Sequence, residues 1–370
     1  MSVWVVVGGQ FGSEGKGKIS AIITLQEQID ICIRCGGPNS GHSFQRENGE
    51  VVLLRQLPTG FVRPQTRLLI PAGGLVDLEI LRREIQLLGL DYSRVGVDRN
   101  AMVIVPNDQQ IERDQGLSER LSSTLCGVGS AVARRALRGP DVQLAADAAV
   151  VQDWLNPLLT DVAAEANSAV DSGKKILVEG TQGSGLSLYH SKYYPKATSR
   201  DTNAAAFLSE VGLSPLLVSE VVLVFRTFPI RVAGPQAGPL SDEITWEMLA
   251  AESNSPLPLH EHTSVTRKLR RVGRFDWEAA RRAVAYNRPT RFAVNFLDYL
   301  GFENRHASRW TDLNSAAKTF LANIESLGAP VQYVGTGPKL SNNISSRLDP
   351  IGETPAINQS NHYTDLSLLP

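Results

Sequence analysis

The sequence predicts an α/β fold in which a mainly parallel central sheet is flanked by helices. Short, continuous apolar runs alternate with segments in which apolar residues recur at helical spacing, as in strand–helix–strand units. The first apolar run, VWVVV, ends directly in Gly8 and Gly9, as a buried strand does when it leads into a phosphate loop. The chain has 370 residues, of which 42% are hydrophobic, enough for a large core. We expect one large α/β domain over residues 1–370, with inserted loops and subdomains.

The apolar runs give the expected strands in chain order. They are residues 3–7, 29–33, 67–70, 101–105, 176–178, 221–225, 292–296 and 331–334. The helical patterns are residues 75–88, 145–169, 277–285 and 313–327. Because ligands of such sheets bind at the carboxyl ends of the strands, the loops that follow the strands are the candidate site.

The loop after the first strand reads GQFGSEGKGK, from Gly9 to Lys18. Its second half fits the letters G-x-x-x-x-G-K, but Ile19 stands where a hydroxyl residue would hold Mg²⁺. The glycines would let backbone N–H groups approach an anion closely, and the two lysines add charge. A glycine-rich turn with exposed lysines is the alternative interpretation.

Three further clusters carry polar side chains. The first, RCGGPNSGHS (34–43), offers an amide, a close-approach glycine and His42, which could act as a general acid or be an ordinary buried histidine. The second, EGTQGSG (179–185), contains Gln182, whose amide could bond a base edge or belong to a polar turn. The third, residues 263–271, combines cations with hydroxyls and suits a dicarboxylate or phosphate, or is a solvated basic surface.

Charge and composition restrict the class of protein. Lys and Arg number 37 against 38 Asp and Glu, so there is no overall basic field for a nucleic-acid polymer. No apolar run reaches the ~20 residues of a membrane span, and no signal peptide precedes the first strand. The three cysteines form no disulfide framework, and the C-x-x-C of Cys32 and Cys35 lacks the second pair of a zinc site. We expect a cytoplasmic protein.

Taken together, the motifs GQFGSEGKGK, GPNSGHS, EGTQG, VARRALR, RKLRRVGRFD and GTGP resemble the adenylosuccinate synthetase family, and the resemblance extends from Val5 to Pro338. The resemblance implies a P-loop-like α/β fold and a homodimer. It also implies a Mg²⁺-dependent ligase that phosphorylates O6 of inosinate with a nucleoside triphosphate, after which the amine of aspartate displaces the phosphate.

The resemblance also implies roles for matching positions. The expected catalytic residues are Ser13, Lys16, His42 (general acid) and Gln182, and the expected Mg²⁺ ligands are Ser13 and the Gly41 carbonyl. The purine nucleotide is expected at Ser13, Asn39, Ser123, Thr124, Arg134, Gln182 and Thr198, with Arg134 reaching the neighbouring subunit's site. L-Aspartate is expected at Thr263, Ser264, Val265, Thr266, Arg267, Lys268 and Arg270. The donor nucleotide is expected at Gly12, Glu14, Gly15, Lys16, Gly17, Lys18, Gly41, His42, Ser43, Arg270, Phe296, Asp298, Gly335, Thr336 and Gly337.

Ser13 departs from the family, which has aspartate there to remove the N1 proton and bind Mg²⁺. A hydroxyl is a weaker base and a weaker metal ligand. The change resembles the phage PurZ type, the N6-succino-2-amino-2′-deoxyadenylate synthases. These use dGMP in place of inosinate, with ATP or dATP as donor. The resemblance to phage enzymes also implies the host cytoplasm as the location if the gene is a phage's. Because guanine carries a 2-amino group, a smaller residue at this edge would make room for it.

Three hypotheses follow. The first is a ligase that acts on dGMP, L-aspartate and ATP or dATP. The second is an ordinary adenylosuccinate synthetase that acts on IMP with GTP, despite the substituted base. The third is a non-catalytic nucleotide sensor, which the aspartate-binding cluster disfavours. The donor stays open, because Asp298 matches the family's reader of guanine while Phe296 stands where the family has lysine and could stack on any purine.

Overall fold

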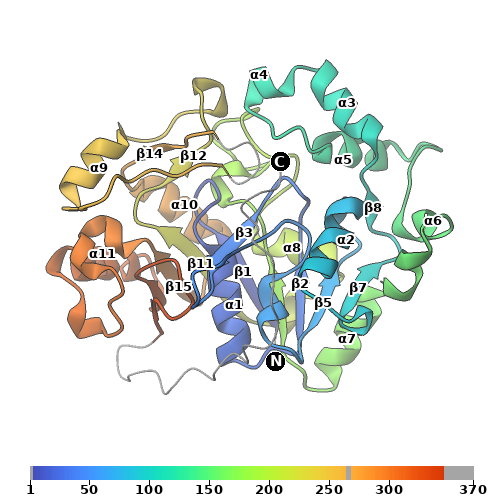
Figure 1. Ribbon diagram of the computed structural model, residues 1–370, viewed down its shortest axis with the longest axis horizontal. Coiled ribbons are helices and arrows are strands. Elements are labelled where there is room, and N and C mark those ends of the chain that lie inside the picture. The colour runs from blue at the N-terminus through green and yellow to red at the C-terminus, as the bar shows by residue number, and fades with distance from the viewer. Residues whose placement is uncertain (1–2, 264–267, 346–370) are drawn as a thin grey trace.

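The structure describes residues 3–263 and 268–345. Their central element is a ten-stranded sheet (Figure 1). The structure is a computed structural model. The strand order is β17-β16-β15-β11-β1-β10-β2-β5-β7-β9, and the recorded pairings are parallel except that of β16 with β17. The predicted mainly parallel sheet flanked by helices is confirmed.

The strands of this sheet are β1 (Val3–Gly8), β2 (Ile31–Arg34), β5 (Arg67–Ile70), β7 (Val95–Asp98), β9 (Leu159–Thr160), β10 (Ile176–Glu179), β11 (Val218–Arg226), β15 (Arg291–Asn295), β16 (Val331–Gly335) and β17 (Asn343–Ile344). Smaller sheets are made by β3 (His42–Gln45) with β4 (Val51–Leu54), by β6 (Leu75–Val76) with β8 (Met102–Val103), and by β12 (Ile230–Arg231), β14 (Arg271–Gly273) and β13 (Glu243–Ile244).

The α-helices are α1 (Lys16–Gln26), α2 (Leu78–Leu87), α3 (Pro106–Asp114), α4 (Leu117–Leu121), α5 (Val128–Leu137), α6 (Ala145–Ala149), α7 (Val162–Asp171), α8 (Ala204–Val211), α9 (Trp246–Glu252), α10 (Trp277–Asn287) and α11 (Ser315–Glu325). The 3₁₀ helices are η1 (Thr59–Val62), η2 (Tyr92–Arg94), η3 (Asp153–Leu158), η4 (Ser184–Leu186), η5 (Pro215–Leu217), η6 (Pro235–Ala237), η7 (Leu297–Leu300), η8 (Phe302–Asn304) and η9 (Trp310–Asp312).

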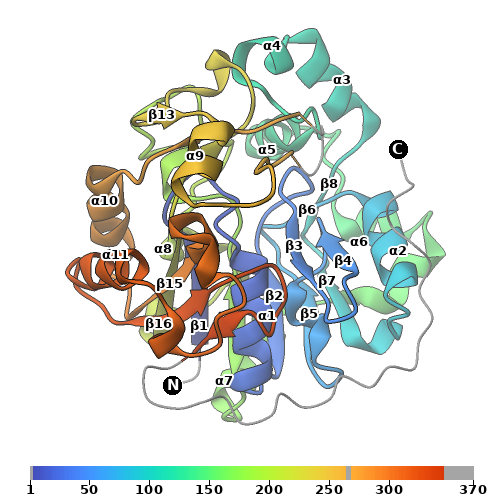
Figure 2. The same ribbon diagram turned by 60° about the vertical axis from the view of Figure 1, so that its left-hand side comes forward.

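Alternate residues of β1 show how the two faces of the sheet are buried. Val3, Val5 and Val7 belong to one core with α7, α8, α10 and α11. Trp4 and Val6 belong to another core with the apolar side of α1. Figure 2 shows α1 against one side of the sheet, with α8, α10 and α11 gathered on the left. Strands covered on both faces read as continuous apolar runs, which is why the sequence predicted most of them.

Three element predictions differ from the structure. Residues 145–169 do not form one helix, because the chain turns through η3, which contains Pro157, and through β9 before α7 begins. Residues 101–105 give only the short strand β8, which pairs with β6 outside the central sheet. Residues 75–76 likewise form β6, so α2 begins later than predicted, at Leu78 with Asp77 as its N-cap.

Candidate active site

The carboxyl ends of β1, β10, β2, β11 and β15 lie side by side and carry the candidate site. Glu179 is in register with Arg34 across β10 and β2, and Arg226 is in register with Asn295 across β11 and β15. The phosphate loop follows β1 between these two pairs of strands. The sheet therefore brings the loops after β1, β2 and β10, which the sequence singled out separately, to one edge.

The phosphate loop is held by its own acidic residue. The Glu14 carboxylate is buried, accepts hydrogen bonds from Gln10 N at 3.0 Å and Gly12 N at 2.9 Å, and pairs with Lys16 Nζ at 2.6 Å. Asn295 Nδ2 donates to the Glu14 carbonyl at 2.7 Å. In this arrangement the Glu14 carboxylate points inward and shapes the loop, and a contact between Glu14 and the donor nucleotide stays a prediction.

Close packing explains two glycines of the loop. A Cβ on Gly15, which has φ +87°, would lie 2.6 Å from Asn295 Nδ2, and one on Gly17 would lie 2.6 Å from the Cβ of His42. The N-terminus of α1 thus packs directly against the start of β3. Lys18 on α1 donates to the carbonyls of Gly337 at 2.7 Å and Asn342 at 2.5 Å, and burial lowers its pKa to about 7. This lysine joins the expected donor segment 335–337 to the phosphate loop.

His42 lies in a buried ionic network. Its Nδ1 is 2.5 Å from Glu179 Oε1, to which Arg34 Nη1 also donates at 3.0 Å. Thr59 holds the other carboxylate oxygen, with its backbone N at 2.9 Å and its Oγ1 at 2.7 Å. Burial, and then the charge of Arg34, lower the pKa of His42 to about 4 although Glu179 opposes them. The ring is therefore neutral at pH 7, with Nδ1–H donating to Glu179.

The other ring nitrogen of His42 is available to a ligand. Nε2 is buried and has no hydrogen-bond partner among the described residues. A phosphate chain beside Nε2 would favour the imidazolium, because a nearby negative charge raises the pKa of a base. This arrangement can deliver a proton or positive charge to a transferred phosphoryl group, as expected of a general acid.

Sequence reasoning missed Glu179 and Arg34 as functional residues. Burial raises the pKa of Glu179, but His42, Arg34 and the hydrogen bonds outweigh this effect and bring it below its ordinary value. Both residues occupy the last position of an otherwise apolar strand, β10 and β2. A charged residue at the carboxyl end of a buried strand is the signal that could have revealed them.

Arg226, also unpredicted, ends β11 in the same way. Its side chain is fully buried, and Nη1 donates to the Ser13 carbonyl at 3.0 Å. Its guanidinium pairs with the Glu261 carboxylate and lies 3.9 Å from the centre of the Phe296 ring. One face of Phe296 is therefore covered by Arg226, which limits the expected stacking on a purine to the rest of the ring.

The other donor-site candidates follow β15 and β16. Asp298 lies in η7, and burial raises its pKa to about 6 against the opposing charge of Arg305. The Thr336 hydroxyl is buried and donates to the Ala307 carbonyl at 2.8 Å, so this side chain is internal. Gly335 and Gly337 flank it beside the carbonyls that hold Lys18.

The expected aspartate segment is described only at its two ends. Thr263 and Lys268 face each other, with Thr263 N donating to the Lys268 carbonyl at 2.9 Å and Lys268 N to Thr263 Oγ1 at 3.0 Å. Arg270 N donates to the Glu261 carbonyl at 2.8 Å, and Trp246 Nε1 to the Arg270 carbonyl at 2.7 Å. Ser264, Val265, Thr266 and Arg267 lie outside the described residues.

The purine-site candidates come from several loops. Gln182, at φ +61°, follows β10 and lies against the phosphate loop, where a Cβ on Gly12 would be 3.8 Å from its Cα. Thr198 N donates to the Leu186 carbonyl at 2.8 Å, which closes the loop after η4. The side chains of Asn39, Ser123 and Thr124 are half-buried in the loops before β3 and α5.

Arg134 is bound within its own subunit in this structure. Its buried guanidinium donates to both oxygens of Asp108, at 3.0 and 2.7 Å, and to the carbonyls of Val103 and Asp141 of the same chain. In this arrangement the side chain ties α5 to α3 and does not point out of the subunit. Contact with a neighbouring subunit's site stays a prediction.

Mg²⁺ would find few protein ligands here. The described residues contain no group of three or more His, Cys, Asp or Glu side chains that could hold a metal. Near the loop, Ser13 Oγ and the Gly41 carbonyl are neutral oxygens, and the Glu14 carboxylate is already engaged by Lys16. This donor set fits a Mg²⁺ that arrives with a nucleoside triphosphate, because Mg²⁺ commonly keeps phosphate oxygens and waters as most of its ligands. Bound there, Mg²⁺ would neutralise phosphate charge.

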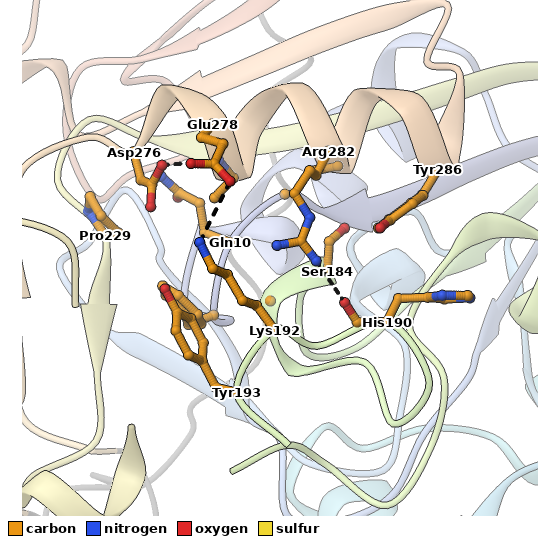
Figure 3. A pocket seen from close by; sticks show the side chains of 15 residues that line it. Gln10, Ser184, His190, Lys192, Tyr193, Pro229, Asp276, Glu278, Arg282 and Tyr286 are labelled. Carbon is orange, nitrogen blue, oxygen red and sulfur yellow. Dashed lines mark hydrogen bonds and ion pairs between the residues drawn. The ribbon is translucent and has the colours of Figure 1, made fainter. Parts of the chain in front are cut away.

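A cavity of about 50 Å³ lies behind the phosphate loop (Figure 3). Its lining includes Gln10 and Phe11 of the phosphate loop together with Lys192, Tyr193 and Arg282. Ligand pockets for small molecules typically measure roughly 300–1,000 Å³, so this cavity is too small for a nucleotide. The expected site residues do not line it.

In the described part of the chain, no helix is long and apolar enough to cross a membrane.

Comparison with known proteins agrees with the site. The family model described as adenylosuccinate synthetase matches residues 5–144 and 140–305. The adenylosuccinate synthetase of Thermococcus sibiricus is 42% identical over 94% of this chain and 99% of its own length, and that of Pyrococcus horikoshii is 41% identical over 93% and 98%.

Two solved structures share the fold. The succinoaminodeoxyadenylate synthetase (PurZ) of cyanophage S-2L, bound to dGMP and dATP, is 28% identical, with a TM-score of 0.80 over 94% of this chain and 96% of its own. The adenylosuccinate synthetase of Plasmodium falciparum is 21% identical, with a TM-score of 0.81 over 94% and 100%. The expected resemblance is confirmed: this chain belongs to the adenylosuccinate synthetase family, whose members are C–N ligases that use Mg²⁺ and a nucleoside triphosphate.

Proposed function

We propose that this ligase joins L-aspartate to C6 of dGMP. A nucleoside triphosphate phosphorylates O6, and the amine of aspartate then displaces the phosphate. The product is N6-succino-2-amino-2′-deoxyadenylate, a precursor for diaminopurine DNA. The observation that carries the proposal is Ser13, which stands where the family has its catalytic aspartate.

The surroundings of Ser13 support a change of substrate rather than a loss of activity. The phosphate loop, the His42–Glu179 pair and the described ends of the aspartate segment are each held by hydrogen bonds. The backbone of Ser13 is fixed by the Arg226 hydrogen bond to its carbonyl, so an aspartate here would hold its carboxylate in the same direction. A hydroxymethyl group takes less space and carries no charge. We infer that the space accommodates the 2-amino group of guanine.

A serine is too weak a base to remove the N1 proton before phosphoryl transfer. Because phosphoryl transfer usually has a loose transition state, positioning and charge neutralisation supply most of the catalysis. Lys16, Lys18 and His42 supply these here, and a late loss of the proton to water or a phosphate oxygen completes the step.

ATP or dATP is the proposed donor. The PurZ structure of cyanophage S-2L, which holds dGMP and dATP, aligns with 94% of this chain and supports both the purine and the donor. We further propose that the enzyme is a homodimer in which Arg134 reaches the neighbouring subunit's site.

The alternative is an ordinary adenylosuccinate synthetase that uses IMP and GTP. Two observations favour it. Archaeal relatives at 36–42% identity carry that name. Asp298 also matches the carboxylate with which the family recognises the guanine base of GTP. A non-catalytic sensor is disfavoured, since it would not need the assembled His42 network.

The deciding experiment measures phosphate release with L-aspartate, Mg²⁺ and ATP while dGMP or IMP is varied. Turnover with dGMP and not with IMP supports the proposal. Turnover with IMP alone would replace it with the ordinary synthetase. Nucleotide binding without turnover of either purine would select the sensor.

A further inference from the structure

Arg231 is a buried cation at the point where three loops meet. It ends β12, and only 3% of its surface is exposed. Its Nη2 donates to the Lys196 carbonyl at 3.0 Å and its Nη1 to the Pro239 carbonyl at 3.2 Å. The guanidinium carbon lies 4.3 Å from the centre of the Phe11 ring and 5.4 Å from that of Tyr193. One side chain therefore contacts the phosphate loop, the loop after η4 and the loop after η6.

Phe11 extends these contacts to the loop after β10. A Cβ on Gly185 would lie 2.6 Å from Cδ1 and Cε1 of the Phe11 ring, so this ring packs directly against the backbone of Gly185. Gly185 N also donates to the Gln10 carbonyl at 2.7 Å. The centre of the Tyr193 ring is 6.2 Å from that of Phe11. The aromatic ring of the phosphate loop thus lies between the cation and the glycine-rich loop.

The loops that meet here carry expected purine-site residues. Ser13 comes two residues after the ring that the guanidinium covers. Gln182 comes three residues before the glycine that packs against this ring, and Thr198 two residues after the carbonyl that the guanidinium binds. The hydrogen bond from Thr198 N to the Leu186 carbonyl, at 2.8 Å, joins the last two segments. The position of each candidate therefore depends on the same cluster.

No carboxylate neutralises Arg231 within the described part of the chain. Burial, and then the like charge of Arg271, lower its pKa to about 10, so the guanidinium stays charged at pH 7. A ring face attracts a cation more strongly where water is excluded. Phe11 and Tyr193 also line the cavity of about 50 Å³ behind the phosphate loop, so the rings are not closely packed on that side. The contact with Arg231 is therefore a main restraint on both rings.

We propose that Arg231 is a positioning residue for the purine nucleotide and that it acts through Phe11. It holds the loops of Ser13, Gln182 and Thr198 in fixed positions relative to one another before the purine binds. A site that is already ordered spares the ligand the cost of ordering it. The next part of the phosphate loop is held separately, by the contacts of Glu14. Loss of the cluster should therefore weaken the purine site far more than the donor site.

The test is steady-state kinetics of the full chain with Arg231→Met and Phe11→Leu, which each remove the contact between cation and ring. KM for the purine should rise by about tenfold or more, the size of one desolvated cation–π contact. The kcat should stay close to that of the wild type, because a saturating purine orders the loops itself. KM for L-aspartate and for the donor should also stay close to the wild-type values. If no turnover occurs, Kd for the purine from calorimetry gives the same comparison.

A rescue and a double variant identify the contact. Phe11→Tyr keeps the ring face and should restore the wild-type KM. Since Arg231→Met and Phe11→Leu break one contact, their combination should be no worse than the stronger single variant. The matched controls are Arg82→Met and Trp154→Leu, which break a guanidinium–ring contact of 5.7 Å outside the expected site and should keep the wild-type KM.

A merely structural role would change kcat and the three KM values together and lower the stability of the fold. That result, or an unchanged purine KM in folded Phe11→Leu, overturns the inference. If Arg231→Met does not fold, Phe11→Leu decides. The inference rests on the proposed placement of the purine at these loops, and it holds for dGMP or IMP. If IMP alone is turned over and its KM rises as expected, the proposed purine fails and the role of Arg231 stands.

Discussion

The replacement Glu179→Gln tests how the buried network prepares His42. It keeps the shape of the side chain but removes the charge that faces His42 Nδ1 at 2.5 Å and Arg34 Nη1 at 3.0 Å. The amide can present its NH₂ group to Nδ1, which would then become the acceptor and place the ring proton on Nε2. His42 would lose both the stabilising carboxylate and its orientation.

The structure sets the expected size of two effects. General acid–base catalysis typically contributes about 10²–10⁴-fold, so kcat should fall by that order. Removing one partner of a buried ion pair typically costs about 3–5 kcal/mol, because Arg34 is left uncompensated. The control Glu165→Gln breaks the partly exposed pair with Arg67, which should cost only about 0–1 kcal/mol and leave kcat unchanged.

The assay is single-turnover product formation at saturating substrates, with denaturant unfolding of the same samples. His42→Asn should reproduce the loss of kcat with little effect on purine affinity. If folded Glu179→Gln retains kcat within about threefold of the wild type, the reasoning that Glu179 prepares His42 as the acid is refuted.

Three further predictions concern other residues of the site. Ser13→Asp should lower kcat/KM for dGMP by about 10²-fold, as a misfitted or unpaired polar group does, and raise it for IMP, which steady-state kinetics with both purines would show. The His42 pKa is lower folded (about 4) than unfolded (6.5), so unfolding takes up protons between these values, and stability should fall as the pH drops through this window. Denaturant unfolding from pH 7 to 4 should show this slope, weakened in His42→Gln. The Asp298 pKa is raised to about 6 when folded, so this group destabilises the fold as the pH rises through 4–6. Asp298→Asn should therefore stabilise the protein at pH 7 by about 1–3 kcal/mol and weaken any preference for GTP over ATP in a donor competition. No gain in stability would show that Asp298 is stabilised in its charged form.

The sequence predicted the central sheet because its strands are buried on both faces and read as apolar runs. It failed at residues 145–169, where alanine-rich segments with helical spacing belong to separate short elements around Pro157. The helices α3, α4 and α5 were not predicted from the sequence, because their burial depends on partners far away in sequence, as Arg134 of α5 depends on Asp108 of α3.

The loops that carry His42, Lys16 and Gln182 could be found from glycine patterns and strand ends. The residues that hold them could not be found in the same way. Glu179, Arg34 and Arg226 act through neighbours on adjacent strands, and only the register of the sheet shows which carboxylate faces which cation. The inward orientation of the Glu14 carboxylate likewise depends on the backbone conformation of the loop, which the residue type alone does not reveal.

The most direct test of the central claim is a competition in one tube. Equal concentrations of dGMP and IMP are supplied with L-aspartate, Mg²⁺ and ATP, and the two succinylated products are separated and quantified over time. The proposal predicts that the 2-amino product forms in large excess. Preferential formation of adenylosuccinate would contradict it and return the enzyme to the ordinary reaction of its family.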